Sequence, residues 1–224
     1  MTLHISIEYK TSWGEEIVLC LGGKRYPLAY VADGLWKGEV ARFNPAKTSE
    51  YSYEVVRDGA VVRTEWKKHK LVLPEGVEPK ELTVSDRWID RPADSPFYSS
   101  AFTNAIFGRK AEKAKKDPKG ANVLFQVSAA ALRPNEVLAL AGSGKALKGW
   151  TKVVPFDGSE YPGWTLALNV TEPFAYKILI ADKETLTPVA WEDGENRWFT
   201  EIPQKDGFVV EADLQVRFGG RNWK

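Results

Sequence analysis

Short runs of strand-forming residues, broken by turn residues, make up roughly the first ninety positions of the chain. Apolar and polar residues alternate in HISIEYK from His4, and EEIVLCL, SEYSYEVV and VVRTEW have the length and composition of strands. Asp58-Gly59 separates two of these runs and predicts a two-residue hairpin. No amphipathic helix fits before residue 95. This part of the chain is therefore expected to be an all-β sandwich or barrel of about seven strands.

The pattern changes after Trp88 and resumes at Asn122. SPFYSSAFTNAIF (95–107) has apolar residues spaced for a short packed helix, and the Ala/Lys-rich run 109–119 is typical of a solvated connector. Strand patterns then return in NVLFQVS, EVLALAG, GWTLALNV, FAYKILI and FVVEADLQVRF. The predicted division is a first β module at 1–89, a partly helical or irregular linker at 90–121, a second β module at 122–218 and a connecting segment at 219–224.

The second module repeats the first at an offset that starts at 120 residues and drifts to 128. A nearly constant offset with small insertions predicts two copies of one fold. The aligned residues are Glu16 with Glu136, Tyr30 with Trp150, Tyr53 with Tyr176, Trp36 with Trp164, and Trp66 with Trp191.

Composition narrows the function. A net charge of +1 argues against general nucleic-acid binding, for which a basic domain is expected. The single cysteine, Cys20, rules out an internal disulfide and fits a reducing compartment. The N-terminus has no apolar signal core, and no stretch approaches the roughly twenty apolar residues of a membrane span. We therefore expect a cytoplasmic protein without a membrane partner. The nine tryptophans must serve a core or a binding face.

The segment WEDGENR (191–197) places a flat ring, a carboxylate and a carboxamide around an Asp-Gly turn. A ring can pack on the C–H face of a sugar while polar groups pair with its hydroxyls. A hairpin centred on Glu184 would set Lys177 opposite Trp191 on one face. Trp150 ends a glycine-containing loop. Both tryptophans could instead be core residues, but their polar, turn-like surroundings favour exposure.

Four segments together resemble the starch-binding domains of carbohydrate-binding module family 20. They are AGSGKALKGW (141–150), YPGW (161–164), FAYK (174–177) and WEDGENR (191–197). The resemblance covers residues 122–218 and implies an immunoglobulin-like β-sandwich that binds α-1,4-glucan or maltooligosaccharides. It implies a first sugar site with two angled tryptophans and three hydrogen-bonding side chains, namely Trp150, Trp191, Lys177, Glu192 and Asn196.

The family's second sugar site pairs a loop aromatic residue with the tryptophan that follows the YPxW turn. In the second module Trp164 matches the tryptophan, but Arg133-Pro134 stands where the loop aromatic should be. Trp164 is thus equally consistent with a core position. In the first module Trp13 and Trp36 supply both rings of this second site.

At its first site the first module keeps two aromatic residues, Tyr30 and Trp66. Glu54 stands in place of the lysine, however, and KKHK (67–70) in place of the Glu-to-Asn segment. We expect weaker or altered sugar binding there, with Lys67 and His69 as candidate contributors.

No pattern in the chain predicts a catalytic residue, a cofactor or a metal. A glycosidase needs two carboxylates on either side of one bond, and nothing places a partner across a sugar from Glu192 or Glu195. His4 and His69 lack metal-ligand spacing. GSGK (142–145) lacks the other residues of a phosphate-binding loop.

The order of segments has a wider resemblance. Two such modules in tandem, together with the segments 53–74 and 95–107, resemble the N-terminal part of the 4-α-glucanotransferases of glycoside hydrolase family 77, the amylomaltases or disproportionating enzymes. The resemblance implies a C-terminal catalytic barrel beyond Lys224, which the modules would target to starch or glycogen. The alternatives are a glucan-associated scaffold or regulatory protein whose first module contacts other proteins, and a stand-alone hydrolase.

Overall fold

The computed structural model describes residues 1–45, 50–91, 95–99, 102–103, 108–109 and 112–219. Strands account for 48% of the described residues and helices for 4%, which confirms the expected all-β class. Among the described residues, no helix has the length and apolarity needed to cross a membrane. The chain forms two compact units, residues 1–92 with 204–213 and residues 93–203 with 214–224. This division differs from the one based on sequence, because residues 204–213 group with the first unit.

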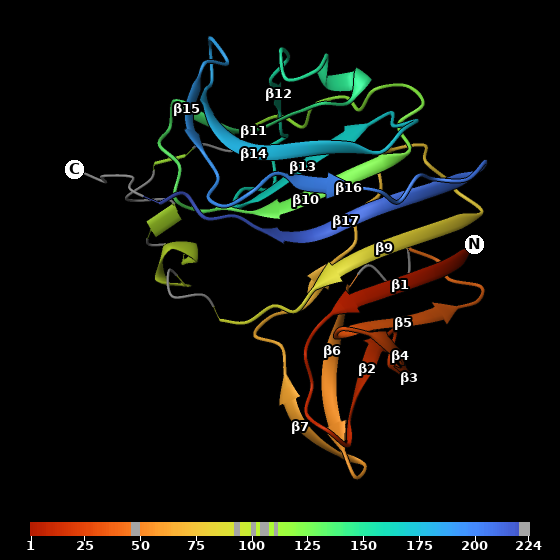
Figure 1. Ribbon diagram of the computed structural model, residues 1–224. Coiled ribbons are helices and arrows are strands. Elements are labelled where there is room, and N and C mark those ends of the chain that lie inside the picture. Colours follow the sequence, from red (N-terminus) through yellow and green to blue (C-terminus); the bar gives the residue numbers. More distant parts are fainter. Residues whose placement is uncertain (46–49, 92–94, 100–101, 104–107, 110–111, 220–224) are drawn as a thin grey trace. The chain divides into compact units, whose positions relative to one another are not determined.

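The first unit contains two sheets (Figure 1). In one of them β3, β2, β6 and β7 lie side by side, and β8 also pairs with β6. In the other, β4, β5, β1 and β9 follow one another, and β17 pairs with β9 in parallel. The strands are β1 (Thr2–Glu8), β2 (Glu15–Leu21), β3 (Lys24–Pro27), β4 (Ala29–Ala32), β5 (Leu35–Val40), β6 (Glu50–Arg57), β7 (Ala60–Thr64), β8 (His69–Lys70), β9 (Glu81–Arg87) and β17 (Gly207–Gln215), of which residues up to Asp213 belong to this unit.

Alternation along β1 builds the core of this unit as the sequence pattern predicts. Leu3, Ile5 and Ile7 are buried, while the residues between them are less so. The Asp58-Gly59 hairpin is also confirmed, since Arg57 pairs with Ala60 and both turn residues have positive φ. Two left-handed residues are what a type I′ turn requires.

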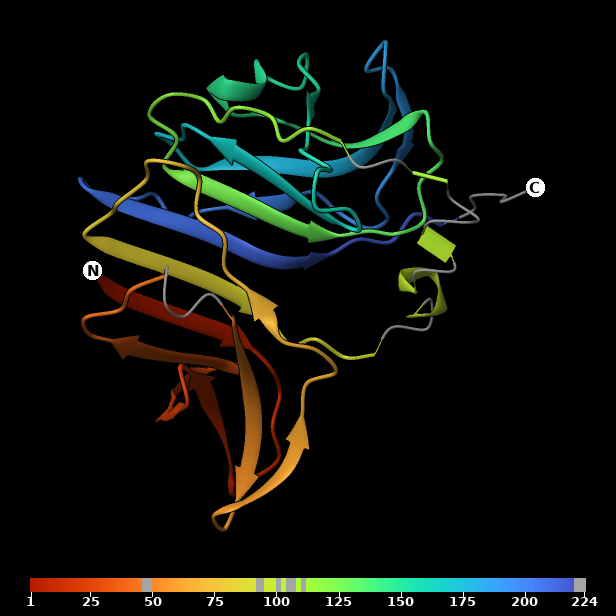
Figure 2. The ribbon, with the colours of Figure 1, turned by 180° about the vertical axis from the view of Figure 1, so that it is seen from behind.

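The second unit has one sheet in the order β12, β11, β14, β15, with β16 also paired to β14. β10 and β13 form a further antiparallel pair, which is best seen from behind (Figure 2). The elements are η1 (Ser95–Tyr98), β10 (Val123–Ser128), β11 (Glu136–Gly142), η3 (Lys145–Leu147), β12 (Val154–Pro155), β13 (Gly163–Leu168), β14 (Phe174–Asp182), β15 (Pro188–Trp191) and β16 (Arg197–Phe199).

Arg109, at the start of the charged connector, packs against the second unit, whereas residues 113–119 are exposed, as expected of a solvated run. The Arg109 guanidinium lies 5.2 Å from the ring centre of Tyr161 and 4.8 Å from that of Trp164. It also donates hydrogen bonds to the carbonyls of Arg133 and Glu136, at 2.9 and 2.7 Å. Ring faces and carbonyl oxygens replace water around the cation, so its burial is favourable. Of the expected helix at 95–107, the described part is η1 and a single turn at residues 102–103; residues 104–107 lie outside the described chain.

The two units repeat one pattern of strand pairing. β1 pairs with β5 as β10 pairs with β13, and β2 pairs with β6 as β11 pairs with β14. β6 then carries β7 and β8 on its other edge, as β14 carries β15 and β16. The internal repeat read from the sequence is therefore present in the pairing of the strands.

Candidate carbohydrate-binding site

Lys177 and Trp191 lie on the same face of the second unit's larger sheet. Along β14, Phe174 and Tyr176 point into the core, where they contact Phe125, so Lys177 points to the opposite face. Trp191 pairs with Leu179, which shares the face of Lys177. The expected direct pairing of Lys177 with Trp191 is wrong by two residues. The hairpin is centred between Glu184 and Thr185, which shifts the pairing by one residue, and a β-bulge between Ile180 and Ala181 shifts it by one more. The two side chains are diagonal neighbours.

Trp150 is presented by a strained loop. Lys148, Gly149 and Trp150 have φ values of 50°, 57° and 70°, and a left-handed conformation costs a bulky residue about 1–3 kcal/mol. The backbone N–H of Trp150 donates to the carbonyl of Gly142 at 2.6 Å, and that of Lys152 donates to Leu147 at 3.1 Å. Trp150 and Trp191 are 37% and 44% exposed. The loop is thus held in a conformation that keeps an aromatic ring in solvent.

The Lys177 ammonium holds the turn after β15. It donates to the carbonyl of Glu192 at 3.0 Å and to that of Gly194 at 2.6 Å. An ammonium has three protons, so one donor is left for a ligand. Asn196, at the end of the same turn, is exposed. Lys177 therefore both shapes the turn and offers a hydrogen bond beside the rings.

Glu192 does not face this surface. Adjacent strand residues point to opposite faces, so a carboxylate that follows the exposed Trp191 is directed inward. Glu192 is 4% exposed, and its carboxylate accepts hydrogen bonds from the backbone N–H of Ile178 at 2.8 Å and from Arg197. The expectation that Glu192 contacts a sugar is therefore corrected, since its carboxylate positions the turn from below.

Backbone groups of residues 215–219 form hydrogen bonds with the turn that follows β15. The backbone N–H of Asp193 donates to the carbonyl of Arg217 at 2.8 Å, and the N–H of Gly219 donates to the Asp193 carboxylate at 2.9 and 3.0 Å. Arg197 donates to the carbonyl of Gln215. The sequence carried no signal for this contact, because the partners lie about twenty positions apart and are mostly backbone groups.

Comparison with known families identifies this part of the chain. Residues 120–209 match the model of the starch binding domain family. Residues 120–209 form a starch-binding domain. The match contains Trp150, Lys177, Trp191 and Asn196.

One relative covers more of the chain than the starch-binding domain. A 4-alpha-glucanotransferase, DPE2, of Oryza sativa subsp. japonica is 30% identical over 67% of this chain. The matched part is 18% of the rice protein, so the chain spans less than a fifth of that relative.

Solved structures with some similarity include a family 20 carbohydrate-binding module of a maltotetraose-forming amylase from Pseudomonas saccharophila. It is 18% identical with a TM-score of 0.35, over 42% of this chain and 97% of that chain. A γ-CGTase from an alkalophilic Bacillus clarkii is 14% identical with a TM-score of 0.36, over 89% of this chain and 23% of that chain. Similarities this low bear on neither fold nor function.

Trp164 of the starch-binding domain and Trp36 of the first unit are core residues, which corrects their assignment to a second sugar site. They hold the same place in the repeat, since Trp36 pairs with Ile7 and Trp164 with Val127. Each is buried, and each indole N–H donates to a backbone carbonyl, of Tyr9 and Ala129 respectively. A buried indole whose N–H is satisfied internally cannot stack on a sugar.

The first unit lacks the loop that carries Trp150 in the starch-binding domain. Val18 and Leu19 of β2 pair with β3 as Ala139 and Leu140 of β11 pair with β12. Between β2 and β3 stands only the two-residue turn Gly22-Gly23, whereas residues 143–153 join β11 to β12. Tyr30 comes after β3 and is exposed on β4, so its alignment with Trp150 is corrected.

The first unit also lacks a ring at the Trp191 position. Tyr51 pairs with His69 as Tyr176 pairs with Arg197, so Tyr51, and not Tyr53, is the counterpart of Tyr176. Thr64 pairs with Glu54 in the first unit in the same way that Trp191 pairs with Leu179 in the second, so Thr64 is the counterpart of Trp191. Trp66 lies two positions beyond Thr64, and the backbone N–H of Trp66 donates to the carbonyl of Ile89.

Tyr30 and Trp66 are consequently not a pair of platforms. Tyr30 lies on β4, and Trp66 bonds to the segment after β9, on the other side of β5 and β1. Three strand spacings, about 14 Å, separate Tyr30 from the level of β9, beyond which Trp66 lies. Trp13, in the loop before β2, is fully exposed. The ammonium of Lys67 lies 5.9 Å from the ring centre of Trp66.

Glu65 is the buried carboxylate that the sequence comparison missed. It accepts a hydrogen bond from the backbone N–H of Tyr53 at 2.7 Å, as Glu192 accepts one from Ile178. It also contacts His69 at 2.8 Å, as Glu192 contacts Arg197. The first unit therefore has a buried carboxylate and a cation at the positions of Glu192 and Arg197, but it has no aromatic ring at the positions of Trp150 and Trp191.

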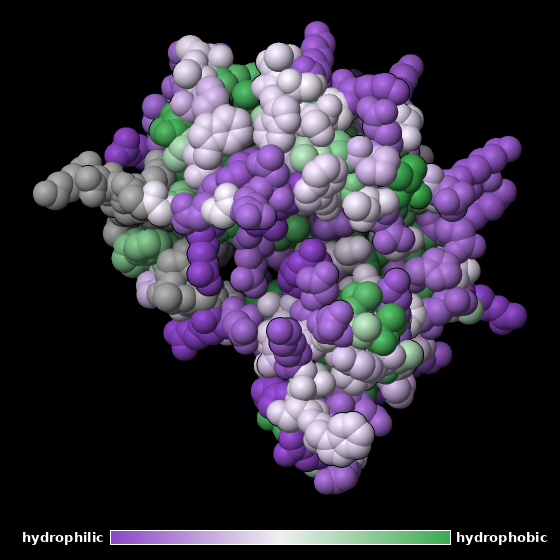
Figure 3. Space-filling model, viewed as in Figure 1, coloured by the Kyte–Doolittle hydropathy of each residue, from purple (hydrophilic) through white to green (hydrophobic). Residues whose placement is uncertain are grey.

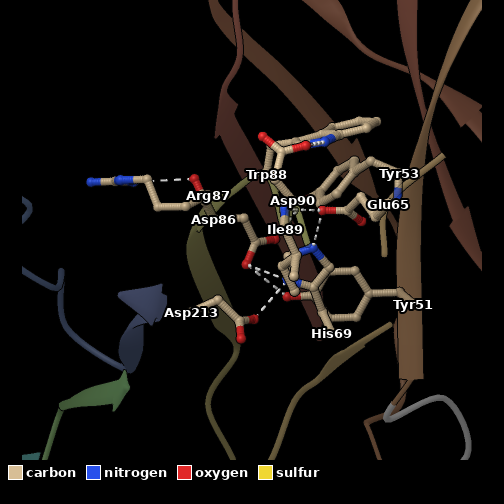
Figure 4. A network of polar contacts seen from close by, with 10 residues as sticks. All are labelled: Tyr51, Tyr53, Glu65, His69, Asp86, Arg87, Trp88, Ile89, Asp90 and Asp213. Atoms are coloured by element: carbon tan, nitrogen blue, oxygen red, sulfur yellow. Dashed lines mark hydrogen bonds and ion pairs between the residues drawn. The ribbon is translucent and has the colours of Figure 1, made fainter. Parts of the chain in front are cut away.

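His69 is the centre of a buried polar network, so its suggested contact with sugar is wrong (Figure 4). Its Nε2 lies 2.8 Å from Glu65, and its Nδ1 lies 2.7 Å from Asp213 and 3.5 Å from Asp86. Burial lowers the pKa of His69, but the charge of Asp86 and the hydrogen bonds to Asp213 and Glu65 outweigh it and raise the pKa to about 10. The ring is therefore an imidazolium at neutral pH.

The network also brings together three residues of metal-binding type that lie far apart in the sequence. Ligand atoms of His69, Asp86 and Asp213 lie within 4.8 Å of one another. A histidine must lose a proton before it binds a metal, whereas here both ring nitrogens face carboxylates. Asp86 accepts hydrogen bonds from the hydroxyls of Tyr51 and Tyr53 as well. This arrangement suits an imidazolium ion better than a metal.

Proposed function

We propose that the starch-binding domain binds α-1,4-glucan or maltooligosaccharide chains between Trp150 and Trp191. The observation that carries the proposal is a half-exposed indole, Trp191, on the same face of the sheet as the Lys177 ammonium, with a second half-exposed indole, Trp150, on the loop that follows β11. The rings would cover the C–H faces of neighbouring glucose residues. The third proton of Lys177 and the carboxamide of Asn196 would pair with their hydroxyls.

Titration of the chain with maltoheptaose, followed by tryptophan fluorescence, tests this proposal. Stacking a sugar on an indole changes the environment of its ring, so we expect saturable quenching that Trp150→Ala and Trp191→Ala each weaken. Trp66→Ala removes an exposed tryptophan of the first unit and serves as the matched control. Affinity unchanged in both Trp150→Ala and Trp191→Ala would refute the assignment.

We also propose that the domain targets an attached 4-α-glucanotransferase to its polysaccharide in the cytoplasm. Support comes from the rice relative, which is named as such an enzyme, and from the single cysteine, which fits a reducing compartment. In a full-length enzyme with a C-terminal catalytic barrel, Trp191→Ala should raise the KM for glycogen while leaving kcat on maltotriose unchanged. Equal kinetics of both enzymes on glycogen would argue against targeting.

A second candidate function, contact with another protein, is favoured for the first unit. The observation is the absence, among its described residues, of rings at the Trp150 and Trp191 positions. The first unit also has exposed apolar side chains elsewhere on its surface, including Val31, Val61 and Val72. On the face in Figure 3, however, apolar residues form small separate groups among hydrophilic ones, so a broad apolar interface is not visible there. Loss of glycogen binding in Trp13→Ala would argue for a sugar contact in this unit instead.

A further inference from the structure

A third tryptophan of the starch-binding domain, Trp198, lies on the same face as Lys177 and Trp191. Trp198 pairs with Ala175, and its neighbour Phe199 points to the core, where it packs against Phe125 and Phe174. Alternation along β16 therefore directs Trp198 to the opposite face. Its side chain is 70% exposed, more than Trp150 or Trp191.

Strand register sets the spacing of these rings. β15 and β16 both pair with the same edge of β14, Trp191 opposite Leu179 and Trp198 opposite Ala175. Four residues of β-strand place their backbones about 13 Å apart. Lys177 lies midway between these two levels of β14. The N–H of Trp150 donates to the carbonyl of Gly142 on the edge of β11 that faces away from β14, so three strand spacings, about 14 Å, separate the backbones of Trp150 and Trp198.

We infer that Trp198 is an additional sugar-stacking subsite, which extends the site to α-glucan chains too long to be covered by Trp150 and Trp191 alone. This inference rests on the proposed function. Trp198 is about 13 Å from Trp191 and about 14 Å from Trp150, and each distance is more than one sugar ring can bridge, so a short oligosaccharide that occupies Trp150 and Trp191 would not also cover Trp198. A longer chain would contact it without any rearrangement of the strands. An exposed indole is the side chain best suited to this contact, because its flat face binds a sugar C–H surface with little loss of conformational entropy.

Affinities for maltotriose and maltoheptaose, measured by calorimetry on the full chain, test the inference. Trp198→Ala should weaken maltoheptaose binding about tenfold, the loss expected for one stacking residue, and change maltotriose binding less than twofold. Trp198→Tyr, which keeps a ring, should restore most of the lost affinity. Trp66→Ala is the control for removal of an exposed tryptophan elsewhere, and thermal melting reports folding of each variant.

The outcomes separate this inference from the proposed function. If Trp191→Ala weakens both sugars while Trp198→Ala leaves maltoheptaose binding unchanged, the additional subsite is refuted and the main site stands. If Trp198→Ala weakens both sugars equally, the extension is also refuted, because a short sugar should not sense a distant ring. If Trp191→Ala changes neither affinity, the proposed site itself fails.

Discussion

Arg197 forms an ion pair with the carboxylate of Glu192 through two of its guanidinium nitrogens. The pair lies beneath the turn that carries the candidate sugar-binding groups. The guanidinium Nε lies 3.1 and 2.9 Å from the two carboxylate oxygens, and Nη2 lies 2.8 Å from one of them. Two parallel contacts of this kind fix the orientation of both groups. Together with Lys177 above, the pair holds residues 192–196 between two cations. The sugar-binding surface is thus supported by charges that do not themselves face the sugar.

Replacing Glu192 by Gln should therefore affect stability more than affinity. The change removes the negative charge that compensates Arg197, and breaking such a buried pair costs about 3 kcal/mol. Urea unfolding should show this loss. At temperatures where the variant stays folded, maltoheptaose affinity should fall less than in Trp191→Ala. A larger loss of affinity than in Trp191→Ala would restore Glu192 as a direct sugar contact.

Replacing Trp191 by Ala should lower the affinity for maltoheptaose more than the stability of the fold. A half-exposed indole contributes little to folding, but as a stacking residue its loss should weaken maltoheptaose binding by about 2 kcal/mol, or roughly thirtyfold. The unfolding free energy should change by less than about 1 kcal/mol. Calorimetric titration and urea unfolding of the same preparation measure both quantities. Destabilisation without loss of affinity would show that Trp191 is structural.

The two core tryptophans offer a test of the corrected assignments. Trp36→Ala and Trp164→Ala each remove a buried ring and leave a backbone carbonyl without its indole partner, so each should cost about 3–5 kcal/mol of stability. The milder Trp164→Phe keeps most of the apolar volume and allows affinity to be measured. We expect its maltoheptaose affinity to equal that of the original protein. A tenfold weaker affinity in folded Trp164→Phe would return Trp164 to a sugar site.

The His69 network predicts a pH dependence of stability. The folded-state pKa of about 10 is above the usual 6.5, so the stabilisation from the imidazolium is complete below pH 6.5 and is lost as pH rises through 10. Denaturation at pH 7 to 10 should show the unfolding free energy falling by at most about 1.4 kcal/mol per pH unit from this group. Burial raises the pKa of Asp86 to about 6, which places its own titration below this range.

The matched control is His69→Gln, which keeps a polar side chain but cannot ionise. Its stability should be lower at pH 7, and its decline between pH 7 and 10 should be shallower than that of the original protein. Parallel pH curves for the two proteins would mean that His69 is not charged in the folded state. Asp213→Asn, which removes one of the carboxylates that raise the folded-state pKa of His69, should lower the pH at which the decline ends and leave its start near pH 6.5 unchanged.

Local sequence determined much of the fold and part of the site. Alternation in HISIEYK, the left-handed pair Asp58-Gly59 and the repeated order of strands were all predictable, because strand period and turn chemistry depend on neighbouring residues. The same holds for the polar, glycine-containing surroundings that keep Trp150 and Trp191 at the surface. The offset between the repeats was harder to read. An alignment by residue type placed Trp66 on Trp191, whereas the strand pairing places Thr64 there.

Only the tertiary structure decided which way the important side chains point and what they meet. The centre of the hairpin and a bulge together placed Trp191 opposite Leu179 and not Lys177, and alternation turned Glu192 inward, since strand register depends on a partner strand and not on the segment itself. The charge of His69 depends on Asp213, 144 residues away along the chain. Burial of Trp36 and Trp164 likewise follows from the sheets packed around them. Sequence specified the residues able to bind a glucan, and packing specified which of them face the solvent to do so.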